Sequence, residues 1–360
     1  MIITRTPFRF TLGGGGTDLP SYYSRYGGFV FTAAMDKYMF IAVNRPIVDD
    51  LVRLKYSSSE TVEHVGELQH QLARVALEHT GIKNAIEVIS WADIPAGTGL
   101  GSSSCYVVGL LNALYAQRRD VRSAAEIAET GCHLEMNILK KPIGKQDQYV
   151  AAFGGLPVLE IAKDGKVSVR QAAIDFSTMD ELNRNTLIFY TGKTRSADEI
   201  LQHQDTSVKK ENKDVTDSLH RIKEIGYKIL EAMETGNLDD FGHLMHEHWE
   251  SKKKLSSKIA DERLHRIYEI ARENGALGGK VTGAGGGGFF VFYTSNKHHQ
   301  LRKAMLSEGL RELRYRFDTE GSKVLVNLAD SRGRYESYTE PFWATPETSR
   351  KYEIGLSGNA

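Results

Sequence analysis

The pattern of hydrophobic and polar positions changes from strand-like to helix-like along the chain. Alternating apolar and polar residues predict strands at residues 1–10, 29–34, 38–44, 52–56 and 85–91. Apolar residues at helical spacing predict helices at residues 65–79, 106–116, 123–140, 208–235, 238–255, 261–274 and 296–308. Further short strand-like runs lie at residues 158–161 and 167–170, which predict a hairpin, and at residues 187–191, 289–293, 312–317 and 323–327.

The change of pattern near residues 174–185 predicts a domain boundary. A chain of 360 residues is longer than one hydrophobic core usually supports, so we expect two domains, residues 1–182 and 183–330. Residues 331–360 have no clear periodicity and are predicted as a tail without a defined fold.

The charge composition limits the kinds of molecule that the chain is expected to bind. Lys+Arg and Asp+Glu are equal at 46 each, so the net charge does not favour nucleic acid or an anionic membrane, and we expect a small-molecule partner. The N-terminus carries Arg5 and Arg9 where a signal peptide needs an apolar run, and no run approaches a membrane span. We therefore expect a cytoplasmic protein, in which Cys105 and Cys132 are buried free thiols.

A glycine- and serine-rich segment at residues 94–104 joins a predicted strand to a predicted helix. Gly97, Gly99 and Gly101 allow positive φ and close approach of the backbone to a ligand. The serines at 102–104 fall in the first helical turn, where free N–H groups and the helix dipole favour an anion. The segment predicts a polyphosphate site; the alternative is an ordinary glycine-rich turn capped by serine.

Two further glycine runs are candidate ligand loops. Residues 13–16 are four glycines followed by Thr17 and Asp18, so the run either lines a ligand or forms a flexible loop. Residues 280–288 contain G-x-G-x-x-G, but a strand follows instead of a helix, which excludes a dinucleotide fold. That loop is predicted to lie against substrate or phosphate.

Other chemistry-bearing residues are less specific in isolation. Asp147 follows a helix-breaking proline and, without further context, is better explained by an ordinary surface position. His243, His246 and His248 do not share one helix face and have no clear fourth ligand, so a metal site there is not expected.

Together, the three glycine segments and their neighbours resemble the GHMP kinase superfamily. The resemblance rests on residues 6–18, 95–104 and 280–288 and covers roughly residues 1–327. It is greatest to bacterial sugar kinases of the heptose 7-phosphate kinase group, because of residues 13–20 and the tyrosines and glycines that follow them.

The resemblance implies a two-domain α+β fold, with a ribosomal-protein-S5-like N-terminal domain, a ferredoxin-like C-terminal domain and ATP in the cleft between them. It implies contacts to the ATP phosphates from Pro95, Gly97, Gly99, Leu100, Gly101, Ser102, Ser103 and Ser104, and a Mg²⁺ site at Ser103 and Glu135. Asp147 matches the family's candidate base, and Arg9 would stabilise its carboxylate and the transferred group.

The resemblance also implies which residues contact the substrate. It implies sugar contacts from Gly14, Gly15, Gly16, Thr17, Asp18, Gly285, Gly286 and Gly287. Galactokinases have Glu-His where this chain has Gly15-Gly16, which disfavours galactose and leaves room for a larger sugar. Lys193 and Arg195 are candidates for binding a sugar phosphate, or are solvated surface residues.

The implied activity is ATP-dependent phosphorylation of the anomeric hydroxyl of D-glycero-D-manno-heptose 7-phosphate, which would supply nucleotide-activated heptose for a surface glycan. One alternative is the same chemistry on an unphosphorylated sugar, fucose or heptose. A second is a catalytically silent nucleotide- or sugar-binding regulator. The sequence makes no prediction of oligomeric state.

Overall fold

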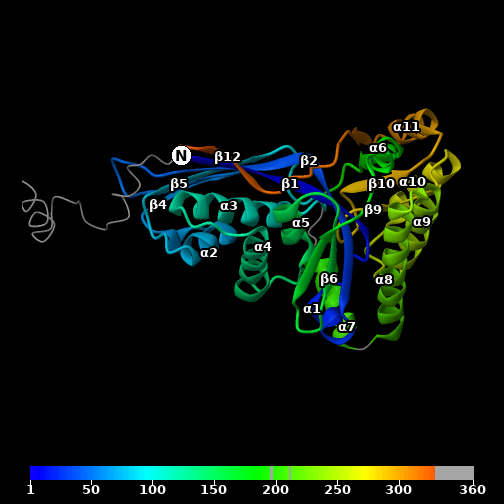
Figure 1. Ribbon diagram of the computed structural model, residues 1–360, viewed down its shortest axis with the longest axis horizontal. Helices are drawn as coiled ribbons and strands as arrows, with labels where there is room; N and C mark the ends of the chain where they lie inside the picture. Colours follow the sequence, from blue (N-terminus) through cyan, green and yellow to red (C-terminus); the bar gives the residue numbers. More distant parts are fainter. Residues whose placement is uncertain (195–197, 211, 329–360) are drawn as a thin grey trace, which may run out of the picture.

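The computed structural model describes residues 1–194, 198–210 and 212–328 and contains two β-sheets with helices packed against them (Figure 1). The larger sheet has the strand order β12-β1-β2-β5-β3-β4, and β6 and β7 extend it from β2. Its strands are β1 (Ile2–Gly13), β2 (Gly28–Asn44), β3 (Val52–Lys55), β4 (Ser59–Val62), β5 (Ile86–Ala92), β6 (Pro157–Ile161), β7 (Val167–Gln171) and β12 (Lys323–Asn327).

Strand β2 is a single long strand, whereas the sequence pattern predicted two strands at 29–34 and 38–44. Its first residues pair with β6 and its last residues pair with β5, and it pairs with β1 along most of its length. The polar residues Asp36 and Lys37 interrupt the alternation at a point where the β1–β2 register shifts. A bulge therefore accounts for the apparent gap between two strands.

Helices cover one face of the larger sheet, and α3 lies across β1 and β2 (Figure 1). The contact is close because Gly109 has no side chain: a Cβ there would lie 2.7 Å from the Thr6 hydroxyl oxygen. The helices of this part are α1 (Pro20–Tyr26), η1 (Val65–Glu67), α2 (Gln71–His79), α3 (Ser102–Arg118), α4 (Ala124–Cys132), η2 (His133–Ile138) and α5 (Gln146–Phe153).

The smaller sheet has the order β11-β8-β10-β9, and α8 and α9 pack side by side next to it (Figure 1). Helix α8 also reaches β1, where a Cβ at Gly13 would lie 2.7 Å from the Gly226 Cα atom. The elements are α6 (Phe176–Asn185), β8 (Thr186–Tyr190), α7 (Asp198–Lys209), α8 (Lys213–Glu234), α9 (Leu238–Lys253), α10 (Glu262–Glu273), β9 (Gly278–Val281), β10 (Phe289–Tyr293), α11 (His298–Ser307) and β11 (Arg311–Leu313).

The helices differ from the sequence prediction in several places, and α1 and α6 were not predicted. The helix predicted at 65–79 is the short η1 followed by α2, and the one predicted at 208–235 covers the last two residues of α7 and all of α8. The helix predicted at 123–140 begins with the expected Ser123–Glu126 capping box but continues past α4 as the π-helical η2. Helix α5, which carries Asp147, was not predicted.

The chain returns to its first sheet at the end of the described residues. Strand β12 pairs antiparallel with β1, although the sequence placed residues 323–327 within the second predicted domain. The boundaries at 182 and 330 stay predictions, and the predicted tail at 331–360 lies outside the described residues. Within those residues, every helix is too short or too polar to cross a bilayer.

Candidate active site

The three glycine segments meet at one cavity of about 320 Å³ between the two sheets. Residues of β1, the first segment (13–18), the second segment (95–104) and α5 line one wall. Residues of α9, β9 and the third segment (280–288) line the opposite wall. Segments far apart in the sequence therefore build one site.

The second glycine segment holds its shape through left-handed backbone conformations. Gly97, Gly99 and Gly101 have φ of 76°, 78° and 85°, and helix α3 begins at Ser102 directly after them. The side chains of L-residues rarely adopt such angles, so glycine is needed at these positions. The first turn of α3 then directs its free N–H groups at the cavity, as a phosphate site requires.

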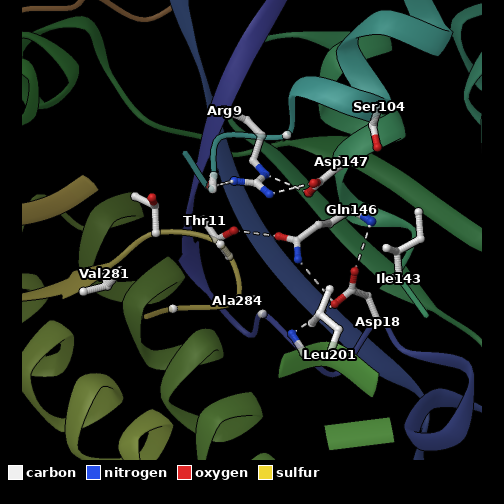
Figure 2. Close-up of a pocket in the computed structure, with 18 of the residues that line it drawn as sticks. Arg9, Thr11, Asp18, Ser104, Ile143, Gln146, Asp147, Leu201, Val281 and Ala284 are labelled. Carbon is white, nitrogen blue, oxygen red and sulfur yellow. Dashed lines mark hydrogen bonds and ion pairs between the residues drawn. The ribbon is translucent and has the colours of Figure 1, made fainter. Parts of the chain in front are cut away.

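Arg9 and Asp147 form a two-pronged ion pair in the cavity (Figure 2). Arg9 Nε donates to Asp147 Oδ1 at 2.7 Å and Arg9 Nη2 donates to Oδ2 at 2.6 Å, while Nη1 donates to the Gly99 carbonyl at 2.8 Å. Arg9 is 4% exposed and Asp147 is 23% exposed. Burial alone would lower the pKa of Arg9, but Asp147 outweighs it and the pKa is raised. The carboxylate is thus held as an acceptor beside the second glycine segment.

Asp18 is the centre of a second polar network, drawn in Figure 2. Its carboxylate accepts hydrogen bonds from the backbone N–H of Gly16 at 3.0 Å and of Gln146 at 3.1 Å. The Gln146 side chain in turn accepts from the Thr11 hydroxyl at 2.6 Å. Burial raises the pKa of Asp18. Asp18 and Gln146 present amide and carboxylate groups that can bind hydroxyls of a sugar.

Glu135 is the third carboxylate of the site and is 1% exposed. It accepts hydrogen bonds from Ser104 Oγ at 2.8 Å and Gln148 Nε2 at 2.7 Å, and Lys141 Nζ lies 3.4 Å from its other oxygen. Burial raises its pKa, against the opposing effect of Lys141. The hydroxyl bonded to Glu135 is therefore that of Ser104, whereas the sequence paired Glu135 with Ser103, which is exposed to the cavity in the first turn of α3.

The donor set in this corner suits a hard cation. Ser102 Oγ is buried with no hydrogen-bond partner in the described structure, and the carboxylate of Glu135 faces the same cavity. No cluster of three or more His, Cys, Asp or Glu residues occurs within residues 1–194, 198–210 and 212–328. A cation here would need further oxygen ligands from phosphates and water, which is how Mg²⁺ is usually held.

Most of the glycines and serines predicted to touch ligand do line the cavity: Gly15, Gly16, Gly97, Gly99, Gly101, Ser102, Ser103, Ser104, Gly285 and Gly287.

Five predicted ligand contacts do not line the cavity: Gly14, Thr17, Pro95, Leu100 and Gly286. Thr17 is buried, and its hydroxyl bonds the carbonyls of Gly14 and Phe29; a Cβ at Gly14 would lie 2.0 Å from the latter carbonyl oxygen. Leu100 is buried and its carbonyl accepts from Arg9 N–H, while the Pro95 carbonyl accepts from Thr98. Gly286 N–H donates to the Ile259 carbonyl.

Lys193, one of the two predicted phosphate-binding cations, does not line the cavity either. Lys193 Nζ lies 2.7 Å from an Asp261 carboxylate oxygen, and its side chain is 47% exposed. Its backbone does contact the third glycine segment, because Gly288 N–H donates to the Lys193 carbonyl at 2.9 Å. Arg195 lies outside the described residues.

The sequence analysis missed four basic residues that line the cavity: Lys141, His248, Lys252 and Lys280. Lys280 is the first residue of the third glycine segment, and His248 and Lys252 are four residues apart on α9, so they share one face of that helix. That spacing was a usable signal, but it does not show that this face is turned inward.

A fold with these three glycine segments around an Arg–Asp pair defines the GHMP kinase class, and the comparisons agree. The family models "GHMP kinases N terminal domain" and "GHMP kinases C terminal" match residues 67–155 and 229–310. The chain belongs to the GHMP kinase family.

Particular relatives are sugar kinases. The chain is 30% identical over 334 residues to D-glycero-alpha-D-manno-heptose 7-phosphate kinase of Campylobacter jejuni, covering 89% of this chain and 98% of that protein. It is 26% identical to L-fucokinase/L-fucose-1-P guanylyltransferase of Bacteroides fragilis, covering 87% of this chain and 37% of that protein. The chain is accordingly a GHMP sugar kinase, and an ATP-dependent phosphotransferase.

Solved structures share the fold. A D-glycero-D-manno-heptose 1-phosphate kinase from Bacteroides thetaiotaomicron matches with a TM-score of 0.73 at 21% identity, over 91% of this chain and 99% of that one. Lactococcus lactis galactokinase complexed with galactose matches with a TM-score of 0.69 at 20% identity, over 89% and 94%. The predicted two-domain GHMP kinase fold is confirmed.

Proposed function

We propose that this kinase phosphorylates the anomeric hydroxyl of D-glycero-D-manno-heptose 7-phosphate, giving the 1,7-bisphosphate. The proposal rests on one observation above the rest: the Arg9–Asp147 pair lies between the phosphate-type turn of α3 and the Asp18 network. The heptose 7-phosphate kinase of Campylobacter jejuni, similar over nearly its full length, supports the choice of sugar. The product would serve the synthesis of nucleotide-activated heptose for a surface glycan.

Asp147 acts as the general base. The anomeric hydroxyl oxygen bonds to the terminal phosphorus of ATP, the bond from that phosphorus to the bridging oxygen breaks, and ADP leaves. The hydroxyl proton passes to the Asp147 carboxylate. Arg9 keeps that carboxylate oriented through two hydrogen bonds and adds positive charge beside the group in transfer. Phosphoryl transfer requires mainly this positioning and charge stabilisation.

Ser103 and Glu135 would hold Mg²⁺. When bound, the ion neutralises charge on the nucleotide phosphates. Ser104 Oγ and Gln148 Nε2 donate hydrogen bonds to Glu135 Oε2, at 2.8 and 2.7 Å, and so fix the position of the carboxylate. Such hydrogen bonds to a ligating carboxylate orient it for the ion, and Ser103 is free to turn its hydroxyl into the cavity.

The sugar binds beside the first glycine segment. Asp18 and the Gln146 amide hydrogen-bond its hydroxyls, and the backbone of Gly15 and Gly16 lines the same part of the cavity. Gly285 and Gly287 close the opposite side of the cavity. Lys193, bonded to Asp261, is not a suitable partner for the sugar phosphate in this arrangement.

A phosphorus NMR time course with Mg·ATP tests the proposal. D-glycero-D-manno-heptose 7-phosphate is compared with unphosphorylated heptose, fucose and galactose. A new anomeric phosphate signal with the 7-phosphate, and none with the other three, is the expected result. A signal only from a neutral sugar would overturn the choice of substrate, and intact ATP in all four reactions would overturn the proposed activity.

The alternative substrate class, an unphosphorylated sugar, is favoured by the similarity to the fucokinase of Bacteroides fragilis. The same NMR comparison separates the two classes. A catalytically silent regulator is disfavoured because Arg9, Asp147 and Glu135 all face one cavity, an arrangement that binding alone does not require.

A further inference from the structure

The wall of the cavity opposite Asp147 carries three basic groups: His248 and Lys280 are buried and Lys252 is partly buried. Lys252 Nζ donates to the carbonyls of Val281 at 2.9 Å and Gly283 at 2.6 Å. Lys280 Nζ donates to the Leu12 carbonyl at 2.6 Å and lies 3.4 Å from His248 Nε2. Lys280 and His248 are each 2% exposed. These side chains come from α9 and β9 and converge on one place.

Within the described residues, the two lysines of this group have no acidic partner. Arg9 is paired with Asp147, but within the described residues no carboxylate forms an ion pair with Lys252 or Lys280. His248 Nδ1 is buried with no hydrogen-bond partner. Buried ammonium groups are costly unless an anion or a full set of hydrogen bonds compensates them. Such an arrangement indicates a missing negatively charged partner.

We propose that Lys252, Lys280 and His248 form a phosphate-binding subsite, separate from the first turn of α3. The ligand of this subsite is a phosphate dianion, which is either the phosphoryl group in transfer or the phosphate carried by the sugar. The inference rests on the proposed function, because that function supplies both sources of the phosphate. When they are protonated, the two lysine ammonium groups and the imidazole offer several hydrogen-bond donors. They present no acceptor atom that would repel the phosphate oxygens.

The electrostatics of the cavity agree with the geometry. Burial lowers the pKa of Lys252 to about 7, with Arg9 on β1 as the second cause. Burial, Lys252 and Arg9 lower the pKa of Lys280, and burial with Lys280 and Lys252 lowers that of His248. The facing carboxylate on α5, Asp147, is already paired to Arg9. A bound dianion would raise these values, so binding takes up protons.

The test uses the intact enzyme saturated with Mg·ADP, which occupies the α3 turn, and inorganic phosphate as the probe in a calorimetric titration. Lys252→Met and Lys280→Met are compared with Lys253→Met. Lys253 is the next residue on α9 and pairs with Glu250 outside the cavity, so it is a matched control. We expect the first two variants to weaken phosphate binding by about tenfold or more, and the control to bind like the wild type.

Replacing ADP by a non-hydrolysable ATP analogue separates the two sources. If phosphate still binds, the subsite takes the phosphate of the sugar. If binding is lost, the subsite holds the phosphoryl group in transfer. Folded Lys252→Met and Lys280→Met variants with wild-type phosphate affinity would overturn the proposal.

A wild-type measurement covers the case in which the variants do not fold. Sulfate remains a dianion from about pH 6 to about pH 9, whereas Lys252, whose pKa burial lowers to about 7, loses its proton over this range. We expect sulfate affinity in the presence of Mg·ADP to fall with rising pH, and a flat profile would overturn the subsite. Because the probe is an inorganic anion, failure here is distinct from failure to phosphorylate the heptose.

Discussion

The substitution Asp147→Asn examines the central pair of the site. Asparagine has nearly the shape of aspartate and keeps one oxygen acceptor, but it cannot take up the hydroxyl proton. It also replaces one of the two charge-assisted acceptors at 2.7 and 2.6 Å by an NH₂ group facing Arg9. The change therefore removes the base and disturbs the orientation of the buried guanidinium.

The magnitude follows from the two roles. Positioned general bases contribute about 10²–10⁴ in rate, so we expect kcat to fall by about 10³, or ~4 kcal/mol of transition-state stabilisation. KM for ATP should change little, because Asp147 is not among the turn residues that meet the nucleotide. The free energy of unfolding should fall by ~2 kcal/mol, below the value for removing a partner from a fully buried pair, since Asp147 is 23% exposed.

The assay is steady-state ADP release with the accepted sugar, with urea unfolding on the same preparation. Asp49→Asn is the matched control, because Asp49 forms the same two-pronged pair with Arg53 at 2.9 and 2.8 Å, but on the surface. The control should leave kcat unchanged. A folded Asp147→Asn enzyme with kcat within tenfold of the wild type would refute the base assignment.

Three further predictions concern other parts of the site. Glu135→Gln removes the buried carboxylate bonded to Ser104, so the Mg²⁺ concentration for half-maximal activity should rise by about tenfold or more; an unchanged Mg²⁺ titration would contradict its role. Gly144→Ala places a Cβ 1.9 Å from Asp18 Oδ2, so Asp18 must move and KM for the sugar should rise while KM for ATP stays constant, which initial-rate kinetics will show. Because burial lowers the pKa of Lys252 from 10.5 to about 7, the unfolded chain binds the extra proton between these values, and the free energy of unfolding should rise with pH across that range. Lys252→Met should flatten this rise in urea titrations at several pH values, and an equally steep profile would contradict the buried position.

Local features of the sequence were enough to predict the phosphate-type turn. The glycines at 97, 99 and 101 and the following helix form a local unit, and the structure has positive φ at each glycine and α3 beginning at Ser102. The pairing of Arg9 with Asp147 is different, since 138 residues separate them. No periodicity connects such residues, and only the family resemblance brought them together before the fold was known.

Lys193 shows where sequence reasoning found the right backbone and the wrong side chain. The prediction placed it near the substrate, and its carbonyl does bond the third glycine segment. Its ammonium group is bonded to Asp261 instead, at the N-terminus of α10. The direction of a long, flexible side chain depends on charged neighbours that become adjacent only in the folded chain.

Lys252 shows the opposite error. Lysine is mostly exposed in proteins, so nothing in the sequence pattern singled out Lys252 as a residue of the site. Burial of that face follows from the packing of α9 against β9, which brings Lys252 to the carbonyls of Val281 and Gly283. The interior basic residue was therefore visible only after the two elements had been placed side by side.

The two walls of the cavity differ in charge in a way that explains why both domains are needed. The wall from the larger sheet presents carboxylates, at Asp18, Glu135 and Asp147, which suit sugar hydroxyls and a cation. The opposite wall presents Lys252, Lys280 and His248. A phosphate bound between the walls compensates the charge of the basic wall. The carboxylates of the opposite wall are then left to bind the sugar and the metal ion. Because the cost of burying the basic groups is offset only when that anion is present, the site favours phosphate over water before any chemistry begins.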